Sequence, residues 1–276
     1  MNSDSKEQDL IHEEFTYISG ALTQILKCGP WEDLWNDKSA PRLLFLVIPE
    51  MPLNDTDDVF GLQGQAEHKL KFLRKYVPKD VKLVLIGHSI GSYFILKIMK
   101  HSPELEILRS ILLFPTIERM AESPQGKLLT PLLCQLRYIL YIPIYLATLL
   151  PERVKSFLVR FALNQHGFLC KFCFLMCMPV CLISAANIMY LASHEMRSVQ
   201  ERDNSTIKQH LNKLIFYYGA TDRWCPLQYC EEMKMEFPDG DIRICEKGIC
   251  HSFVLNSSKE MAEMITGWIQ NDLAKL

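Results

Sequence analysis

Ser89 lies in the pentapeptide GHSIG (residues 87–91) and is the side chain best placed to act as a nucleophile. An apolar run precedes it and a helix-forming run follows it, a setting typical of a serine held on a sharp strand-to-helix turn. The flanking glycines permit this turn, because a Cβ there would collide with the neighbouring strand or helix. The alternative is a structural turn with a helix-capping serine. We predict Ser89 as the nucleophile, with the Ile90 N–H as one donor to an oxyanion.

A serine hydroxyl needs a base to take its proton and an acid to orient that base. Asp222 and His251 follow Ser89 in the order Ser, Asp, His, which is one known order of such triads. Each lies just past a predicted strand, where the loops of an open parallel sheet converge. Alone, Asp222 is typical of a turn and His251 of a loop. Their joint placement predicts them as acid and base.

Other side chains compete for these two roles. His88, His194 and His210 are alternative bases, although His88 lies inside the turn and the other two lie in polar, helix-like stretches. Glu118 follows an earlier strand and is the alternative acid. The joint placement of Asp222 and His251, each just past a predicted strand, favours this pair, and Glu118 stays the second choice as acid.

The elements that would position these residues alternate between buried strands and helices. Short apolar runs predict strands at 42–48, 81–86, 110–114, 214–218 and 241–246. Amphipathic periodicity predicts helices at 61–77, after residue 91 and at 258–276. A β-hairpin over 14–26 is expected to pack at a sheet edge. This alternation predicts an α/β fold with a mostly parallel sheet and helices on both faces.

Length and composition limit the class of protein. The chain has 276 residues, is 49% hydrophobic and 22% charged, and carries a net charge of −2. These values favour one domain over residues 1–276 and no nucleic-acid binding. The ten irregularly spaced cysteines and the polar start at residues 1–10 indicate reduced thiols on the cytosolic side.

Residues 128–192 form an unusually apolar insertion between two predicted strands. Within it, residues 131–150 and 168–182 contain one charge each, and Pro143 and Pro179 interrupt them. Long membrane-spanning helices are therefore not expected. We expect hydrophobic helices that dip into one leaflet of a lipid surface. A lid buried against its own domain is the alternative, and one segment could serve both purposes.

Four cysteines in this insertion repeat at helical spacing. They are Cys170, Cys173, Cys177 and Cys181. A zinc site is disfavoured by the single C-x-x-C and the apolar surroundings. Core thiols are the simplest interpretation, and palmitoylation on a membrane-facing helix is a further hypothesis.

Several stretches resemble one known family. They are LIGHSIGSYF (85–94), LLFPTIERM (112–120), TPLLC (130–134), FYYGATDRWCP (216–226), FPDGDIRICE (237–246) and HSF (251–253). On these stretches the chain resembles the lipid droplet-associated hydrolase family of the α/β-hydrolase superfamily. The resemblance implies an α/β-hydrolase fold and a triad of Ser89, Asp222 and His251. It also implies an enzyme on lipid droplets and the cytosolic face of the endoplasmic reticulum, acting on ester lipids such as cholesteryl esters in lipid storage and cholesterol homeostasis.

The chain departs from this family after the strand at 42–48. The family has a Pro-Gly-Asn-Pro-Gly-like turn that supplies the second oxyanion N–H, whereas here Pro49 runs into Glu50-Met51-Pro52. The domain is therefore expected to be shortened between 49 and 61, with weak activity, because one lost donor costs ~10²–10³ in rate. The alternative is a droplet-bound protein that acts by coating or recruitment; a soluble carboxylesterase is a third possibility. Acyl transfer to serine needs no cofactor or metal. The oligomeric state stays unknown.

Overall fold

A computed structural model gives the arrangement of residues 11–18, 21–28, 43–48, 61–77, 79, 81–151, 153–154 and 182–275. Five parallel strands form its central sheet, in the spatial order β3-β4-β5-β6-β7. The strands are β3 (Leu43–Ile48), β4 (Lys82–His88), β5 (Ile107–Leu113), β6 (Leu214–Gly219) and β7 (Asp241–Cys245). All five predicted strands are confirmed, with ends that differ by a few residues. Because the strands run in one direction, the loops after β4, β6 and β7 meet at one edge.

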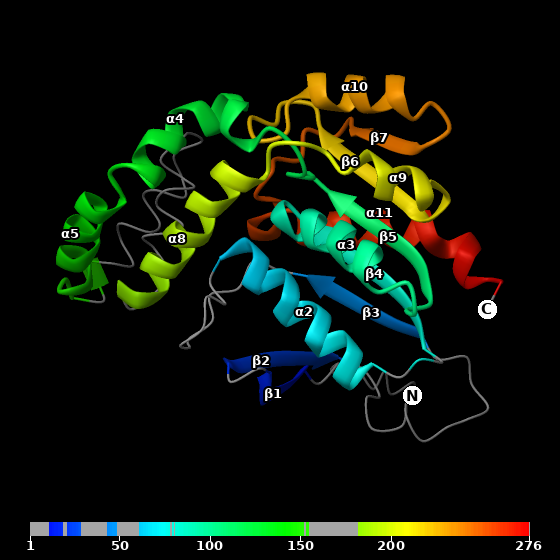
Figure 1. Ribbon diagram of the computed structural model, residues 1–276, viewed down its shortest axis with the longest axis horizontal. Coiled ribbons are helices and arrows are strands. Elements are labelled where there is room, and N and C mark those ends of the chain that lie inside the picture. The colour runs from blue at the N-terminus through cyan, green and yellow to red at the C-terminus, as the bar shows by residue number, and fades with distance from the viewer. Residues whose placement is uncertain are drawn as a thin grey trace, which may run out of the picture.

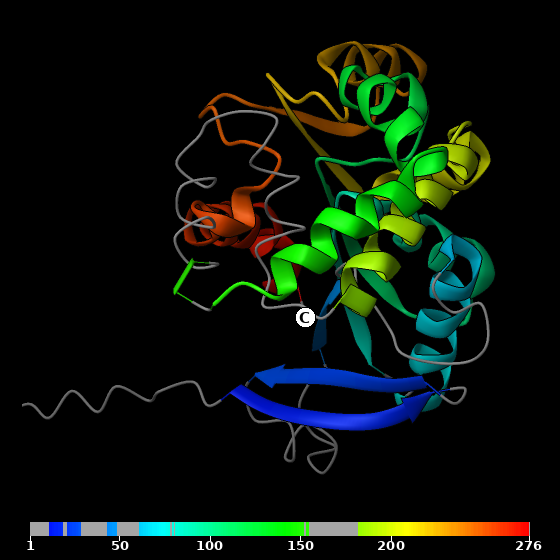
Figure 2. The same ribbon diagram turned by 90° about the vertical axis from the view of Figure 1, so that its left-hand side faces the viewer.

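Helices cover both faces of this sheet (Figures 1 and 2). Helices α2 (Leu62–Tyr76), α3 (Ile90–His101) and α9 (Asn204–Gln209) lie on one face, and α11 (Ser258–Leu273) lies on the other. Helix α10 (Leu227–Glu236) packs against β6 and β7. Short 3₁₀ turns are formed by Met120–Glu122, Leu211–Lys213 and Phe253–Leu255. The predicted α/β architecture, with helices on both faces of a parallel sheet, is confirmed.

The strand that leads to Ser89 is deeply buried in the middle of its length. Leu83, Val84 and Leu85 of β4 are fully buried, because β3 and β5 flank the strand and helices cover its faces. An apolar run without polar alternation is what a parallel strand buried on both faces requires. This burial fixes the position of the turn that follows the strand.

The outer strand β3 is less completely covered. Leu44 and Leu46 pack against the core, whereas the alternate residues Phe45 and Val47 are 46% and 63% exposed. Successive side chains of a strand point to opposite faces, so one face of β3 lacks a cover among the described residues. Parallel strands are ordinarily buried on both faces. The exposure therefore marks the side of the sheet where packing is incomplete.

The N-terminal hairpin does not join the main sheet. Strands β1 (Ile11–Ile18) and β2 (Ala21–Cys28) pair antiparallel with each other in a separate two-stranded sheet. The Thr16 hydroxyl bonds to the Tyr76 hydroxyl at 2.8 Å, and the Thr23 hydroxyl bonds to His68 at 2.8 Å. The predicted hairpin is thus confirmed, but its expected place at the sheet edge is wrong. Hydrogen bonds to α2 hold it instead.

An arm of helices extends from the sheet on the side of the apolar insertion (Figure 1). It consists of α4 (Pro124–Cys134), α5 (Arg137–Thr148) and α8 (Leu182–Ser198). Helix α8 packs against both α4 and α5. Within the described residues, no helix is long and apolar enough to cross a membrane.

Two predicted features lie outside the described residues. One is the shortened connection between 49 and 61, of which only residue 61 is described. The other is the apolar segment at 168–182 with its four cysteines at 170, 173, 177 and 181, of which only Leu182 is described.

The turn from β4 into α3 depends on Gly87. A Cβ built at Gly87 would lie 2.7 Å from the backbone carbon and oxygen of Gly91. Real Cβ atoms do not approach backbone this closely, so any larger residue must displace the start of α3. The predicted collision at residue 87 is confirmed.

We expect Gly87→Ala to lower the free energy of unfolding by about 3 kcal/mol, because strand and helix must separate to admit the methyl group. Gly267→Ala is the matched control, since its Cβ in α11 meets nothing within 4 Å. The control should be stabilised by about 0.5–1 kcal/mol through helix propensity. Urea unfolding of both variants measures this. Equal effects of the two substitutions would contradict the steric argument.

Candidate active site

Ser89 occupies a strained turn at the edge of the sheet. Its backbone adopts φ 54° and ψ −122°, a conformation that non-glycine residues rarely take. Hydrogen bonds hold the turn: the Ser89 N–H donates to the Leu113 carbonyl at 2.9 Å, and the Ser92 hydroxyl donates to the Gly87 carbonyl at 3.1 Å. Such strain costs on the order of 1–3 kcal/mol and persists only where the surroundings enforce it. The turn thereby fixes the Ser89 hydroxyl at the start of α3.

His251 lies within hydrogen-bond distance of that hydroxyl. The Ser89 Oγ and the His251 Nε2 are 2.9 Å apart, although 162 positions separate them in the chain. His251 lies in the loop between β7 and α11 and is 9% exposed. His88 secures this loop, because its Nε2 bonds to the His251 carbonyl oxygen at 2.7 Å. His88 is therefore a support for His251, as its place inside the turn suggested.

Asp222 completes the chain of contacts from the loop after β6. Its Oδ2 lies 2.5 Å from the His251 Nδ1, and its side chain is 1% exposed. Its Oδ1 accepts backbone N–H bonds from Trp224 at 2.7 Å and Cys225 at 3.4 Å. The Cys225 thiol donates to Oδ2 at 3.1 Å. Asp222 is thus both a turn residue and the partner of His251.

These contacts determine the charge on Asp222. Burial acts to raise the pKa of this carboxyl, but the charge of His251 and the hydrogen bonds from His251, Cys225 and Trp224 outweigh it and lower the pKa to about 2. The carboxylate is therefore ionised near neutral pH and can only accept hydrogen bonds. Its contact with Nδ1 places the imidazole proton there. The Nε2 atom is left as the acceptor for the Ser89 hydroxyl.

The competing residues lie elsewhere. His194 packs its ring against Tyr190 within α8, and His210 caps the C-terminus of α9. Glu118 forms ion pairs with Arg202 at 2.8 Å and Arg119 at 2.7 Å. The structure brings together Ser89, Asp222 and His251 and places these three alternatives apart from them.

Aromatic packing around His251 was not predicted from the sequence. The rings of Phe114 and Phe253 lie beside one another with centroids 5.6 Å apart. Phe114 packs edge-on against His251 at 5.7 Å and adopts φ 49°. Phe253 follows two residues after His251, which is the one sequence signal for its role. Phe114 thus packs against the imidazole directly, while Phe253 packs against Phe114 and His88.

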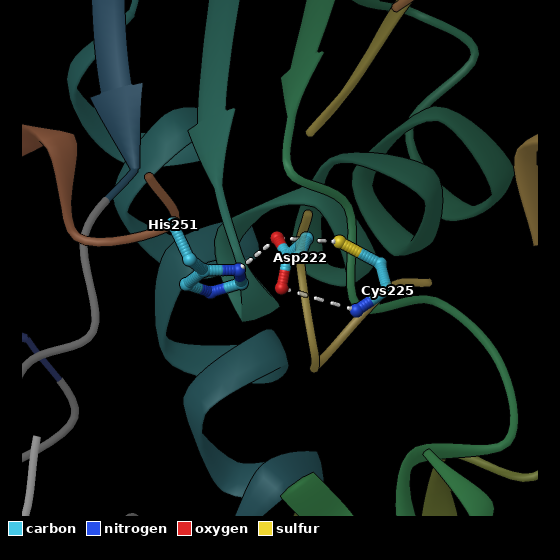
Figure 3. A group of neighbouring side chains, drawn as sticks. All are labelled: Asp222, Cys225 and His251. Atoms are coloured by element: carbon cyan, nitrogen blue, oxygen red, sulfur yellow. Dashed lines mark hydrogen bonds and ion pairs between the residues drawn. The ribbon is translucent and has the colours of Figure 1, made fainter. Parts of the chain in front are cut away.

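Cys225 is the second contact that the sequence reading missed. Its position three residues after Asp222 is a weak signal, because side chains at that spacing meet only if the chain turns. Figure 3 shows Asp222 lying between His251 and Cys225. Asp222, Cys225 and His251 are also the one group of ligand-type side chains, within the part of the chain described, whose donor atoms lie within 4.8 Å of one another.

Ile90 begins helix α3 directly after Ser89. The first N–H groups of a helix have no carbonyl partner within the helix, so the Ile90 N–H suits the predicted role of oxyanion donor. The residues after β3, where a second donor was expected to be missing, lie outside the described residues.

The sequence profile of the family described as "Lipid-droplet associated hydrolase" matches residues 46–254. The chain belongs to this family. A relative from Gallus gallus named lipid droplet-associated hydrolase is 53% identical over 328 positions, and one from Homo sapiens is 44% identical over 328 positions, each alignment covering all of both chains. A relative of the same name from Drosophila melanogaster is 35% identical over 236 positions, covering 81% of this chain and 74% of its own.

The alignment lengths carry a second finding. The alignment with the Gallus gallus relative spans 328 positions, whereas this chain has 276 residues, so at least 52 positions (328 − 276) have no residue here.

Solved structures identify the fold. A thermophilic esterase shares a TM-score of 0.56 at 14% identity, covering 95% of this chain and 98% of its own. The haloalkane dehalogenase DatA from Agrobacterium tumefaciens C58 shares a TM-score of 0.53 at 9% identity, covering 95% of this chain and 97% of its own. At these identities the likeness establishes the α/β-hydrolase fold alone. Because an esterase and a haloalkane dehalogenase share this fold, the reaction has to be inferred from the residues of the site.

We expect the contribution of Asp222 to the free energy of unfolding to decrease as the pH is lowered. Its pKa of about 2 lies below the ordinary value of 3.8, so the contribution is present above pH 3.8 and is lost as the pH falls toward 2. The difference in unfolding free energy between the protein and Asp222→Asn should shrink by about 2 kcal/mol between pH 5 and pH 2. Denaturant titrations at several pH values measure it. A constant difference would show that Asp222 is not held as an ion.

Proposed function

We propose that this chain is a serine hydrolase of ester lipids that works at the surface of lipid droplets. The hydrogen-bonded series Ser89, His251, Asp222 carries this proposal, with distances of 2.9 and 2.5 Å along it. Its three members have the residue types and the hydrogen-bonded arrangement that nucleophilic acyl transfer requires. Membership of the lipid droplet-associated hydrolase family supports the lipid setting.

In this mechanism the Ser89 Oγ attacks the ester carbonyl carbon while its proton passes to the His251 Nε2. Asp222 stabilises the imidazolium through Nδ1, and the Ile90 N–H donates to the oxyanion. The imidazolium then protonates the leaving alcohol, which leaves an acyl group on Ser89. Water, deprotonated by His251, releases the acid and restores the serine. No cofactor or metal enters the reaction.

Ester lipids, including cholesteryl esters, are the substrates that we infer. The family resemblance supports this substrate class and a role in lipid storage and cholesterol homeostasis. It also supports residence on droplets and the cytosolic face of the endoplasmic reticulum. A serine nucleophile rather than a carboxylate suits acyl transfer, and an ester is the acyl bond that we propose.

Helix α5 supports attachment to a lipid surface. Tyr138, Ile139, Ile142 and Leu146 fall on one helical face and are 57–66% exposed. We call this set the α5 apolar face. Arg137 is the single charged residue of the helix, and its guanidinium bonds to the Ser193 and Tyr138 hydroxyls. A continuous exposed apolar face on a short helix suits shallow insertion into a phospholipid monolayer.

Incomplete packing favours a second candidate function. Among the described residues, β3 is the outer strand of the sheet and has one exposed face, which an additional strand and helix would cover. We infer that the positions absent from this chain fall after β3, between residues 49 and 61. The second oxyanion donor would then be lost, and the chain would be a weakly active, droplet-bound protein that acts by coating or recruitment.

Labelling with a fluorophosphonate probe tests the nucleophile and separates these two functions. We expect the purified chain to be labelled and Ser89→Ala to remain unlabelled, because the probe reacts only with an activated serine. Hydrolysis of a droplet-borne ester should fall by at least about 10³ in the same variant. The Gallus gallus relative is the control, because it contains the positions that are absent from this chain. Labelling of that relative alone would favour the coating function.

Placing charge on the α5 apolar face should release the protein from lipid. We expect the pair Ile139→Glu and Ile142→Glu to reduce binding to phospholipid-coated triacylglycerol droplets about tenfold or more, since two apolar contacts are replaced by carboxylates. Met235→Glu is the matched control, because Met235 is 76% exposed on α10. Flotation assays measure bound and free protein. Unchanged flotation of the double variant would rule out this face.

A further inference from the structure

We propose that Asp222, Cys225 and His251 form an inhibitory zinc site within the proposed active site. Three donor types that zinc binds well meet here: a carboxylate oxygen, a thiol sulfur and an imidazole nitrogen. Two of the residues come from the turn after β6 and the third from the loop after β7. The thiol of Cys225 takes no direct part in the proposed reaction; its printed contact is the hydrogen bond to Asp222.

The donor atoms already converge on one point. The His251 Nδ1 and the Cys225 Sγ both contact the same oxygen of Asp222, Oδ2, at 2.5 and 3.1 Å (Figure 3). Zinc ligands lie about 2 Å from the metal. The three donor atoms lie within 4.8 Å of one another, a span that an ion about 2 Å from each ligand bridges after small shifts of the side chains.

The protein environment supports tight binding at this position. Asp222 and Cys225 are each about 1% exposed and His251 is 9% exposed. Backbone N–H bonds from Trp224 and Cys225 to Oδ1 orient the carboxylate, as outer contacts do in established metal sites. Three protein ligands leave one coordination position for water.

Zinc would replace the two protons that now link these atoms. The thiol proton is released to solvent, and the imidazole binds through Nδ1 in its neutral form with its proton on Nε2. The Nε2 atom then cannot accept the Ser89 proton. The ion thus blocks the base without touching the nucleophile. This consequence depends on the proposed function, whereas metal binding does not.

Cadmium absorption tests the site without any need for activity. A cadmium–thiolate bond gives an ultraviolet charge-transfer band that zinc abolishes in competition. We expect one high-affinity band in the wild-type chain and in Ser89→Ala, which keeps all three ligands. Cys225→Ser should weaken the affinity at least about tenfold. Cys250→Ser is the matched control, because Cys250 is exposed beside His251 in the chain but outside the cluster.

A second variant, Asp222→Asn, keeps the proposal testable if Cys225→Ser does not fold. Asp222→Asn keeps every thiol and nearly the same shape, and it should also weaken cadmium binding at least about tenfold. Equal affinity in the wild type, Cys225→Ser and Asp222→Asn would overturn the proposal. So would a loss of affinity that is as large in Cys250→Ser as in Cys225→Ser.

Probe labelling then tests the inhibitory effect. We expect stoichiometric zinc to slow fluorophosphonate labelling of the wild type at least about tenfold, and a chelator to restore it. Labelling of Cys225→Ser, compared with its own rate without metal, should respond far less. Equal slowing of both would contradict the assignment of the site. If the wild type is unlabelled even without metal, the proposed function fails while the cadmium band still decides the site.

Discussion

The buried carboxylate of Asp222 is the interaction on which the site depends. An isolated ionised carboxylate would be costly at this depth, since burial favours its neutral form. Four hydrogen bonds, from two backbone N–H groups, one thiol and one imidazole, offset that cost. The same contacts hold the turn after β6, set the tautomer of His251 and bring the thiol of Cys225 to the carboxylate. The contacts of the Asp222 carboxylate therefore stabilise the turn and also orient the proposed base.

The parallel sheet makes this convergence possible. Strands β4, β6 and β7 run in one direction, so the loops that follow them reach a common edge. Their contributions differ in kind. The loop after β4 is rigid and strained at Ser89, the loop after β6 is fixed by its own hydrogen bonds, and the loop after β7 is secured by His88 and aromatic packing. The nucleophile is thus fixed by backbone, and the base by side chains.

One face of β3 is exposed among the described residues, whereas the proposed site lies in the loops after β4, β6 and β7. The exposed Phe45 and Val47 and the detached hairpin concern the first part of the chain, whereas the contacts of Ser89, His251 and Asp222 come from the later strands. A hydrogen-bonded site can therefore persist beside a sheet edge that the described residues leave uncovered. This separation explains why the geometry supports a nucleophile even where the sequence predicts a lost oxyanion donor.

The sequence by itself predicted the five strands of the main sheet, three of the helices and the three residues that the structure brings together. Buried parallel strands are apolar throughout, and their ends mark where polar loop residues converge, so Ser89, Asp222 and His251 were accessible from pattern and order. Only the tertiary structure decided the rest. Which oxygen of Asp222 meets His251, and that Cys225 reaches the same atom, depend on how separate loops pack. The hairpin's attachment to α2 likewise depends on side-chain contacts between distant segments, which local patterns do not encode.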